Sequence, residues 1–273
     1  MNTGKLVRMN RIFSHRSGRL CSVAVDHFMG YNVGLPPGLR HIGATLAAVV
    51  AAEPDAVTMH KGIAASAWQP YAGRLPLIIQ STGARPDDTA REQFADPLDA
   101  IRLGADGFAV AAFIRGATEG AALRAVADCV RQAAVYEIPV ICHIYPRDTK
   151  TNAISFLPED IAWAVRCAVE VGADVVKTPY CGDVAAYAQI IADCPVPLVA
   201  AGGPKAGTLR EALEMFSQVV KSGARGATIG RNVWGFEQIG AAVHAFKAVI
   251  HDGKSADEAL KLAGLATMVG DKR

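Results

Sequence analysis

The sequence predicts a single (β/α)₈ barrel. Eight short apolar segments alternate with longer amphipathic segments, most of them rich in alanine. Strands that alternate with helices favour a parallel sheet, and eight such units in 273 residues favour a closed barrel, which needs about 250. Gly-Ala pairs at Gly104, Gly172 and Gly223 stand where a helix ends before a strand, a position that favours left-handed backbone. An open doubly wound sheet is the alternative, but no GxGxxG follows the first apolar segment.

The elements follow from the same alternation. The expected strands are 20–26, 56–60, 75–81, 107–113, 139–145, 174–178, 197–203 and 226–231. The clearest helices are 39–52, 120–136, 158–172, 208–223 and 235–252, and 255–266 is expected to add one more helix at the C-terminal end. The residues before the first strand are expected to form a short N-terminal extension. No composition shift marks an internal linker, so residues 1–273 are expected to be one domain.

Composition excludes several classes of partner. The net charge is +2 and no block of five basic residues occurs, which argues against nucleic acid. The longest apolar run, 47–52, is too short for a membrane helix, and residues 1–17 lack the apolar stretch of a signal peptide. Six cysteines without a CxxC pair favour a reduced, cytoplasmic protein. A charged fraction of 20% is slightly low, which favours some surface buried between subunits.

Polar residues gather at one end of the expected strands. In a barrel of this class the active site lies at the carboxyl ends of the strands. The residues that fall there are Asp26, His27, His60, Lys61, Gln80, Tyr145, Arg147, Lys177, Gly202, Gly203, Lys205, Gly230 and Arg231. We expect His27, His60, Lys61 and Arg147 to contact substrate because they also lie at the carboxyl ends of the expected strands.

Lys177 carries the sharpest expectation. Alternation along the strand places Val175 and Lys177 on one face, and that face should be the barrel interior. Burial disfavours the ammonium form and lowers the pKa, which would yield the neutral amine that attacks a carbonyl to form a Schiff base. The alternative is a strand-end lysine whose head reaches solvent.

Two glycine-containing turns predict a phosphate site. Gly202 and Gly203 precede Lys205 after the seventh strand, and Gly230 precedes Arg231 after the eighth. These two loops bind phosphate in many barrels of this class, because glycine lets backbone N–H groups approach an anion and a cation adds a charged hydrogen bond. The alternative is a pair of tight turns that need glycine for their backbone angles.

Tyr145 and Asp26 are candidates for proton transfer. Tyr145 shares the expected inward face of its strand with residues 141 and 143, and a phenol beside a Schiff base can shuttle protons. Asp26 ends the first strand and could balance charge or exchange protons. The alternatives are an aromatic cap on the barrel core and a turn residue.

These residues resemble the archaeal-type class I fructose-bisphosphate aldolase family, which includes the aminodideoxyheptulosonate synthases and the autoinducer-2 processing enzyme. The resemblance extends along nearly the whole chain and rests on Arg8-Met9-Asn10-Arg11-Ile12-Phe13, Val23-Ala24-Val25-Asp26-His27, Met59-His60-Lys61-Gly62, Val175-Val176-Lys177-Thr178 and Ala201-Gly202-Gly203-Pro204-Lys205.

The resemblance implies a (β/α)₈ barrel with a Schiff-base lysine, no metal and no cofactor. It implies that Lys177 forms the imine, that Tyr145 transfers protons and that Asp26 is the acidic partner. It further implies that Gly203, Gly230 and Arg231 bind the phosphate of a sugar substrate. Homo-oligomers, as rings of five or ten subunits, are common in the family.

One departure from the family pattern concerns the substrate. The family usually has Asp-His-Gly after the first strand, whereas here Phe28 and Met29 stand between Asp26-His27 and Gly30. The sugar is therefore less certain than the chemistry, and fructose 1,6-bisphosphate is one candidate. The expected reaction is attack by neutral Lys177 on a phosphorylated ketose, or on dihydroxyacetone phosphate as donor, followed by cleavage or formation of a C–C bond.

Competing functions stay open at this point. Transaldol chemistry or acyl transfer from a phosphorylated dicarbonyl would use the same lysine. A metal-dependent lyase could use His27, His60, His143 and Asp26, although no two of them have a close ligand spacing. A non-catalytic sugar-phosphate-binding barrel is the third alternative. A nicotinamide-dependent dehydrogenase is disfavoured by the missing dinucleotide fingerprint.

Overall fold

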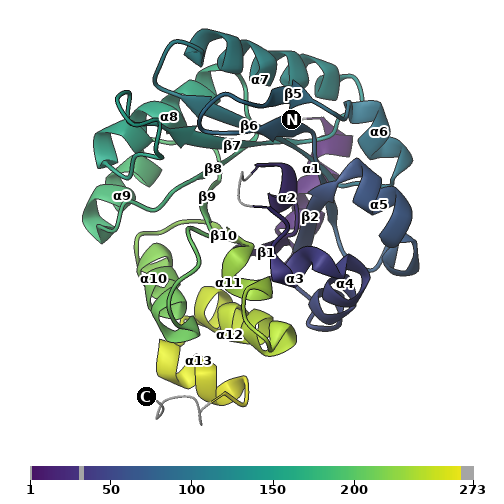
Figure 1. Cartoon of the computed structure of the whole chain (residues 1–273), viewed down its shortest axis with the longest axis vertical. Coiled ribbons are helices and arrows are strands. Elements are labelled where there is room, and N and C mark those ends of the chain that lie inside the picture. Colours follow the sequence, from purple (N-terminus) through teal and green to yellow (C-terminus); the bar gives the residue numbers. More distant parts are fainter. Residues whose placement is uncertain (1, 31–33, 266–273) are drawn as a thin grey trace.

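A computed structural model describes residues 2–30 and 34–265 of the chain. Eight parallel strands close into a barrel in the order β1-β10-β9-β8-β7-β6-β3-β2 (Figure 1). They are β1 (Leu20–Ala24), β2 (Ala56–His60), β3 (Leu77–Gln80), β6 (Gly107–Ile114), β7 (Val140–Pro146), β8 (Val175–Thr178), β9 (Leu198–Ala201) and β10 (Gly226–Ile229). The predicted closed (β/α)₈ barrel is confirmed, and the open-sheet alternative is wrong.

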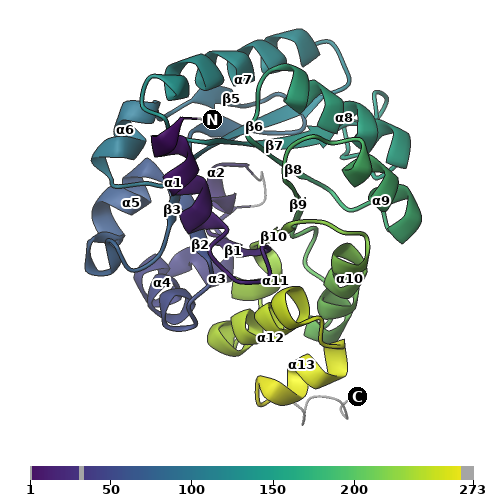
Figure 2. The same cartoon turned by 180° about the vertical axis from the view of Figure 1, so that it is seen from behind.

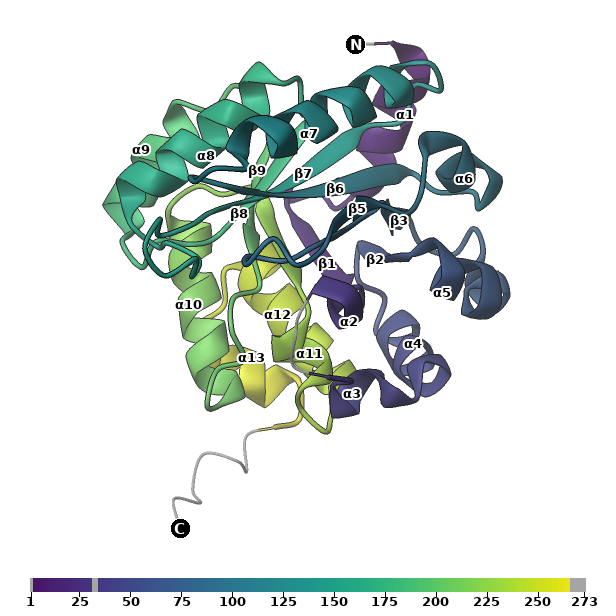
Figure 3. The ribbon, with the colours of Figure 1, turned by 45° about the horizontal axis from the view of Figure 1, so that its top comes forward.

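Helices surround the barrel. The longer ones are α4 (Ile42–Ala51), α5 (Lys61–Ala67), α6 (Pro97–Arg102), α7 (Glu119–Ala134), α8 (Pro158–Glu170), α9 (Val184–Ala192), α10 (Leu209–Lys221), α12 (Ile239–Asp252) and α13 (Ala256–Leu262). Short turns α2 (His27–Gly30), α3 (Pro37–Arg40), η1 (Gln69–Tyr71) and α11 (Arg231–Trp234) lie in the loops. The expected extra helix is α13, which packs against α10 and α12 (Figure 3), although Ala266 lies outside the described residues.

Local sequence signals set the ends of several helices. Thr208 accepts a hydrogen bond from the Glu211 amide at the start of α10, and the Glu211 carboxylate accepts one in return from the Thr208 amide. The three predicted helix-to-strand glycines all have positive φ, from +70° at Gly104 to +91° at Gly172 and Gly223. Only glycine adopts such angles at little cost, so these positions stop each helix before the next strand.

The N-terminal segment is an element of the barrel and not a loose extension. Helix α1 (Thr3–Ile12) crosses the opening at the amino ends of the strands (Figure 2). Its residues Met9 and Ile12 are buried against an inner cluster of Leu20, Ala56, Ile78, Ala109, Ile141, Val175 and Val199. Ion pairs of 2.9 Å from Lys5 to Asp174 and from Arg11 to Asp106 fix the helix to the strand ends. Because α1 fills this end, a substrate must enter the interior from the opposite one.

Six of the eight strands end at a different residue from the predicted one; β1 ends at Ala24, two residues before Asp26, and β9 ends at Ala201, before the glycine turn. The eighth strand ends at Ile229, and Arg231 opens α11 instead of ending the strand. The third strand ends at Gln80 and is followed by β4 (Thr82–Ala84), which pairs antiparallel with β5 (Arg91–Gln93). The sequence did not indicate this hairpin, because its short strands carry little apolar alternation.

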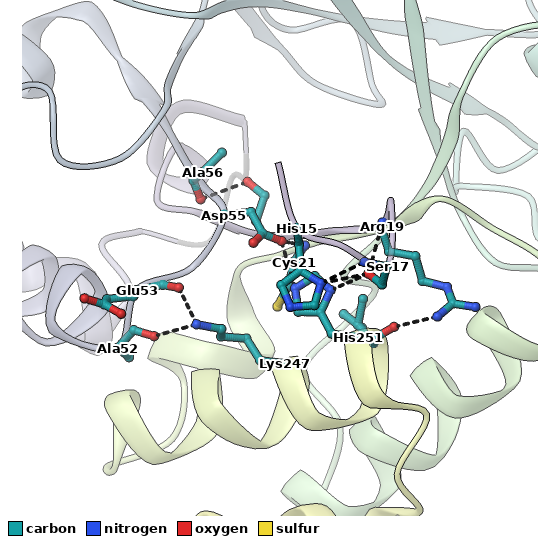
Figure 4. Close-up of polar contacts among 12 residues, drawn as sticks. His15, Ser17, Arg19, Cys21, Ala52, Glu53, Asp55, Ala56, Lys247 and His251 are labelled. Atoms are coloured by element: carbon teal, nitrogen blue, oxygen red, sulfur yellow. Dashed lines mark hydrogen bonds and ion pairs between the residues drawn. The ribbon is translucent and has the colours of Figure 1, made fainter. Parts of the chain in front are cut away.

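A polar network holds the amino ends of β1 and β2 to the end of α12 (Figure 4). The Asp55 carboxylate accepts a hydrogen bond of 2.6 Å from the Cys21 amide and lies 2.9 Å from His251 Nε2. The ring of His251 stacks on that of His15 with 3.7 Å between centroids, and Ser17 Oγ lies 3.0 Å from Nδ1 of both rings.

Among the described residues, none of the helices combines the length and the apolar character needed to cross a bilayer.

Candidate active site

The side chain of Lys177 points from β8 into the interior of the barrel. It pairs in register with His143 on β7 and Val199 on β9, and its neighbour on the same face, Val175, belongs to the inner cluster above α1. Only 4% of Lys177 is exposed. Burial lowers its pKa, Asp26 opposes this shift and Arg231 adds to it. The environment therefore favours the neutral amine more than bulk water does.

Asp26 lies in the loop directly after β1 and belongs to the same buried group. One carboxylate oxygen is 3.2 Å from His27 Nδ1, and the other accepts a hydrogen bond of 3.1 Å from the Gln80 amide. Burial opposes ionisation of Asp26, but the hydrogen bond from His27 and the positive charge of Lys177 outweigh it and hold its pKa well below the ordinary value. Asp26 is therefore an anion at neutral pH.

Tyr145 ends β7 next to the lysine. Its ring stacks on that of Phe113 with 5.3 Å between centroids. This stacking holds the phenol at the wall of the barrel opening and limits its freedom to turn away.

Two cavities meet at these side chains. The smaller, of about 50 Å³, is lined by Lys177, Asp26, His27, Tyr145, Gln80, Thr82, Ala84, Ala111, Phe113 and His143. The larger, of about 330 Å³, is lined by Lys177, His27, Tyr145, Arg231, Ala201, Gly202, Gly203, Pro204, Thr228, Pro179, Pro86, Ala153, Ile154 and Phe156. Since Lys177, Tyr145 and His27 border both, a molecule bound at the lysine can extend in two directions.

The larger cavity is lined by Gly202 and Gly203 of the first predicted glycine turn. A Cβ at Gly202 would lie 3.0 Å from the Ile229 Cα and 3.2 Å from the Gly230 amide nitrogen, so any other residue would force the two loops slightly apart. Gly203 has a φ of +68°, which requires glycine. Arg231 follows in α11 and lines the same cavity.

Asn232 holds the two glycine turns together. Its amide nitrogen donates to the carbonyls of Gly202 and Pro204 at 2.8 and 2.9 Å, and its oxygen accepts from the Ala206 amide at 2.8 Å. The side chain is buried. These three hydrogen bonds all join Asn232 to the loop after β9, and they fix the shape of that turn.

Five of the predicted site residues do not contact these cavities as expected. Gly230 lines neither cavity, because its backbone packs against the ring of His27. Lys61 opens α5 and forms a 2.8 Å ion pair with Asp99, with 44% of its side chain exposed. The His60 ring lies between the backbone carbonyls of Gln80 and Asp26, at 3.1 and 3.2 Å. Lys61 and His60 both lie at the carboxyl end of the barrel, as predicted. Their side chains, however, bind Asp99 and two backbone carbonyls and not the cavities.

Arg147 and Lys205 are also engaged elsewhere. The Arg147 guanidinium is 2% exposed and donates to Asp88 at 2.8 Å and to the Pro86 carbonyl at 2.7 Å, so it anchors the hairpin loop. Lys205 Nζ lies over the ring of Phe236, 4.9 Å from its centroid, beside a third cavity of about 690 Å³ between α3 and the loop after α11.

Comparison with known proteins identifies the family. A family model described as DeoC/LacD family aldolase matches residues 21–235. The chain belongs to the DeoC/LacD aldolase family. A 2-amino-3,7-dideoxy-D-threo-hept-6-ulosonate synthase of Halobacterium salinarum is 33% identical over 97% of this chain and 98% of that protein. A 2-amino-4,5-dihydroxy-6-oxo-7-(phosphonooxy)heptanoate synthase of Streptomyces griseus is 30% identical over 95% of each chain.

A solved structure agrees with this assignment. An archaeal fructose-1,6-bisphosphate aldolase, whose catalytic lysine is covalently bound to the carbinolamine intermediate of the substrate, superposes with a TM-score of 0.79. It is 25% identical and the match covers 90% of this chain and 99% of that one. The resemblance inferred from the sequence is confirmed, and this DeoC/LacD-family chain is a class I aldolase-type enzyme of the Schiff-base kind.

Three residues of this aldolase site were given no role in it by the sequence: Gln80 was only placed at a strand end, His143 was considered only as a metal ligand, and Asn232 was not singled out. His143 and Gln80 line the smaller cavity, and Asn232 shapes the larger one. The alternation that selects Tyr145 also places His143 inward, which is the signal that could have found it. Asn232 carries no such signal, because its role depends on where two distant loops meet.

The histidines considered for a metal site are divided between different partners. His60 contacts two backbone carbonyls, His27 contacts Asp26, and His143 contacts Gln80. Within residues 2–30 and 34–265, no three His, Cys, Asp or Glu side chains converge in a metal-binding arrangement.

Proposed function

We propose that this aldolase forms a Schiff base between Lys177 and a ketone that carries a phosphate group on the adjacent carbon. The observation that carries the proposal is the position of Lys177, which borders the cavity that is also lined by Gly202, Gly203 and Arg231. The names of two similar proteins support the same chemical class, because a 6-oxo-7-(phosphonooxy) compound and fructose 1,6-bisphosphate both place a phosphate next to a ketone carbon.

The chemistry begins at the neutral amine. Lys177 Nζ attacks the ketone carbon to give a carbinolamine. The former carbonyl oxygen takes up two protons, one of them released by the amine, and leaves as water to give an iminium. Tyr145 borders the same cavities and is the group that would deliver and recover these protons. The Asp26 carboxylate stabilises the iminium charge, because an anion in a buried site interacts strongly with a nearby cation.

The C–C bond is then made or broken beside the iminium. In cleavage, the hydroxyl on the second carbon from the iminium loses its proton and becomes an aldehyde, and the bonding pair moves into the iminium to form an enamine. In synthesis the enamine carbon attacks an aldehyde and the same steps run in reverse. A phosphorylated ketose in one direction, and dihydroxyacetone phosphate as donor in the other, fit this scheme.

The phosphate would be held by the turns after β9 and β10. Backbone N–H groups of Gly202, Gly203 and Gly230 can approach an anion because no side chain intervenes, and Arg231 adds a charged hydrogen bond. Holding the phosphate places the adjacent carbonyl at Lys177, which converts binding into a favourable geometry for attack.

We further expect one cytoplasmic domain that assembles with copies of itself. All six cysteines are free thiols, as in proteins kept reduced. Light scattering coupled to gel filtration measures the assembly directly.

Covalent trapping tests the proposed function. Borohydride added with dihydroxyacetone phosphate is expected to reduce the imine and leave a stable adduct on the tryptic peptide that contains Lys177. Lys247→Met is the matched control, because Lys247 lies at the opposite end of the barrel and bonds the Glu53 carbonyl. An unmodified protein, or equal labelling of Lys177→Met, would rule the Schiff base out.

A further inference from the structure

The orientation of the Gln80 amide follows from its neighbours. The backbone N–H of Thr82 lies 3.2 Å from one atom of that amide and can only donate, so this atom is the oxygen, Oε1. Thr82 Oγ1 accepts a hydrogen bond of 2.7 Å from the Ala111 amide and donates its own proton to Oε1 at 3.1 Å. The Thr82 and Ala111 amides can only donate, so the orientation of the Gln80 amide does not depend on which of its two flipped positions is chosen.

The rest of the amide then determines the tautomer of His143. Gln80 Nε2 must be the NH₂ group, and it lies 3.1 Å from both the Asp26 carboxylate and His143 Nδ1. Nδ1 therefore accepts a hydrogen bond from Gln80 and carries no proton of its own, so a neutral ring has its proton on Nε2. Burial and the charge of Lys177 hold the pKa of His143 well below its ordinary value, which keeps the ring neutral.

The second ring nitrogen is available to a ligand. His143 is buried, lines the smaller cavity and pairs in register with Lys177 across β7 and β8. In the part of the chain that the structure describes, no protein atom accepts a hydrogen bond from Nε2. This nitrogen is also absent from the buried polar atoms that lack a partner, so its surface is accessible from the cavity. Phe113 and Ala111 form apolar walls of the cavity, where a single hydrogen bond is stronger than in water.

We propose that His143 is a catalytic residue whose Nε2–H donates a hydrogen bond to the carbonyl oxygen of the acceptor aldehyde, and that Gln80 is the positioning residue that holds this tautomer. The proposal rests on the proposed function, because the phosphate turns lie on the larger cavity. With the phosphate there, the carbons beyond the iminium extend toward the smaller cavity and His143.

The neutral ring suits this position. When the enamine carbon attacks the aldehyde, the carbonyl electron pair moves to oxygen, and the hydrogen bond from Nε2–H stabilises the charge that develops there. The oxygen takes its proton from Tyr145 or water, and the imidazole proton stays on Nε2. An imidazolium would instead add a second positive charge beside the iminium of Lys177.

The first test distinguishes the effect of the Nε2–H donor of His143 from the effect of its planar ring. His143→Phe keeps a planar ring but removes the donor, and we expect kcat/KM for the aldol reaction to fall about 10²-fold. His143→Gln retains an N–H donor, and we expect it to recover activity to within about tenfold of the parent. Cys142→Ala is the control, because this neighbour on β7 packs outward into the helix layer and should leave kcat/KM unchanged.

The second test reads the tautomer directly. In protein labelled with ¹⁵N-histidine, and assigned with His143→Gln, we expect the Nδ1 of His143 to have the shift of an unprotonated nitrogen and Nε2 that of a protonated one, from about pH 6 to pH 8. Gln80→Glu removes the NH₂ donor, so Nδ1 should gain a proton and kcat should fall with little change in KM for the donor.

The outcomes distinguish this inference from the proposed function. If the parent enzyme gives no borohydride adduct with the phosphorylated donor, the Schiff base itself is wrong. If the adduct forms, but His143→Phe keeps kcat/KM within about threefold or Nδ1 is the protonated nitrogen, the assignment of His143 is overturned. Should His143→Phe fail to fold, His143→Gln, Gln80→Glu and the ¹⁵N shifts decide the question.

Discussion

Each end of the barrel contains a lysine, an aspartate and a histidine, but the surroundings of these residues differ between the two ends. At the carboxyl end Lys177, Asp26 and His143 line a cavity. At the amino end Lys247, Asp55 and His251 bind strand and helix ends: Lys247 Nζ donates to the Glu53 carbonyl at 2.6 Å, and Asp55 contacts both Cys21 and His251 (Figure 4). Among the described residues, Lys177 is buried beside the charge of Asp26, whereas Lys247 is held by backbone carbonyls.

The amino end also shows that a familiar set of residues does not make a site. Ser17, His251 and Asp55 follow the order of a serine–histidine–aspartate triad. Ser17 Oγ, however, accepts from the Arg19 amide at 3.2 Å and is shared with His15, so the hydroxyl is held inside the turn before β1. These bonds join α12 to β1 and β2, and the network is structural.

The largest difference between the ends should appear when each lysine becomes methionine. Lys177→Met removes the attacking amine, and we expect kcat to fall more than about 10³-fold while the fold is retained, because methionine suits a buried position. Lys247→Met should lower Tm and leave kcat unchanged. Steady-state kinetics and thermal unfolding measure both, and a substantial kcat remaining in Lys177→Met would contradict the contrast.

Two arginines that flank β10 allow a second comparison. Arg231→Ala is expected to raise KM about 10- to 100-fold for a phosphorylated ketone and to leave KM for its unphosphorylated analogue nearly unchanged. Arg225 precedes the same strand at the other end and donates to the Gly18 carbonyl at 2.8 Å. Arg225→Ala should therefore change stability but not this preference, and an equal loss for both ketones in Arg231→Ala would remove the phosphate assignment.

The pH profile of the reaction reports the environment of Lys177. Because its pKa is lowered, kcat/KM should rise with pH and level off below the pH at which an ordinary lysine loses its proton. Asp26 raises this pKa and Arg231 lowers it. Asp26→Asn should therefore shift the rising limb to lower pH, and Arg231→Ala should shift it to higher pH. Identical limbs in all three proteins would show that another group titrates.

The smallest effect on activity is expected at Asp55. Asp55→Asn weakens the hydrogen bonds from His251 and the Cys21 amide and should reduce the free energy of unfolding by about 1–3 kcal/mol. Denaturant unfolding measures this loss, with kcat and KM both expected to match those of the parent. A change in KM would mean that the two ends are coupled.

Strand-end position predicted which residues reach the correct end of the barrel, but not where their long side chains go. Lys177 was predictable because its Cβ must point inward from a short strand, and the glycine turns were predictable because they have no side chain to redirect. Arg147 obeys the same rule, yet its guanidinium binds Asp88, which lies in a hairpin loop that the sequence did not indicate. His143 was missed because its role depends on Gln80 and Thr82, which another part of the chain supplies.

The sequence by itself determined the barrel, the inward face of each strand and the family of Schiff-base aldolases, since these depend on local alternation, helix-ending glycines and short motifs. Tertiary structure alone decided that α1 closes the amino end, that Asn232 joins the two glycine turns, and that His143 carries its proton on Nε2. Each of these depends on contacts between residues far apart in the chain, and the direction of a hydrogen bond is defined only once both of its partners are in place.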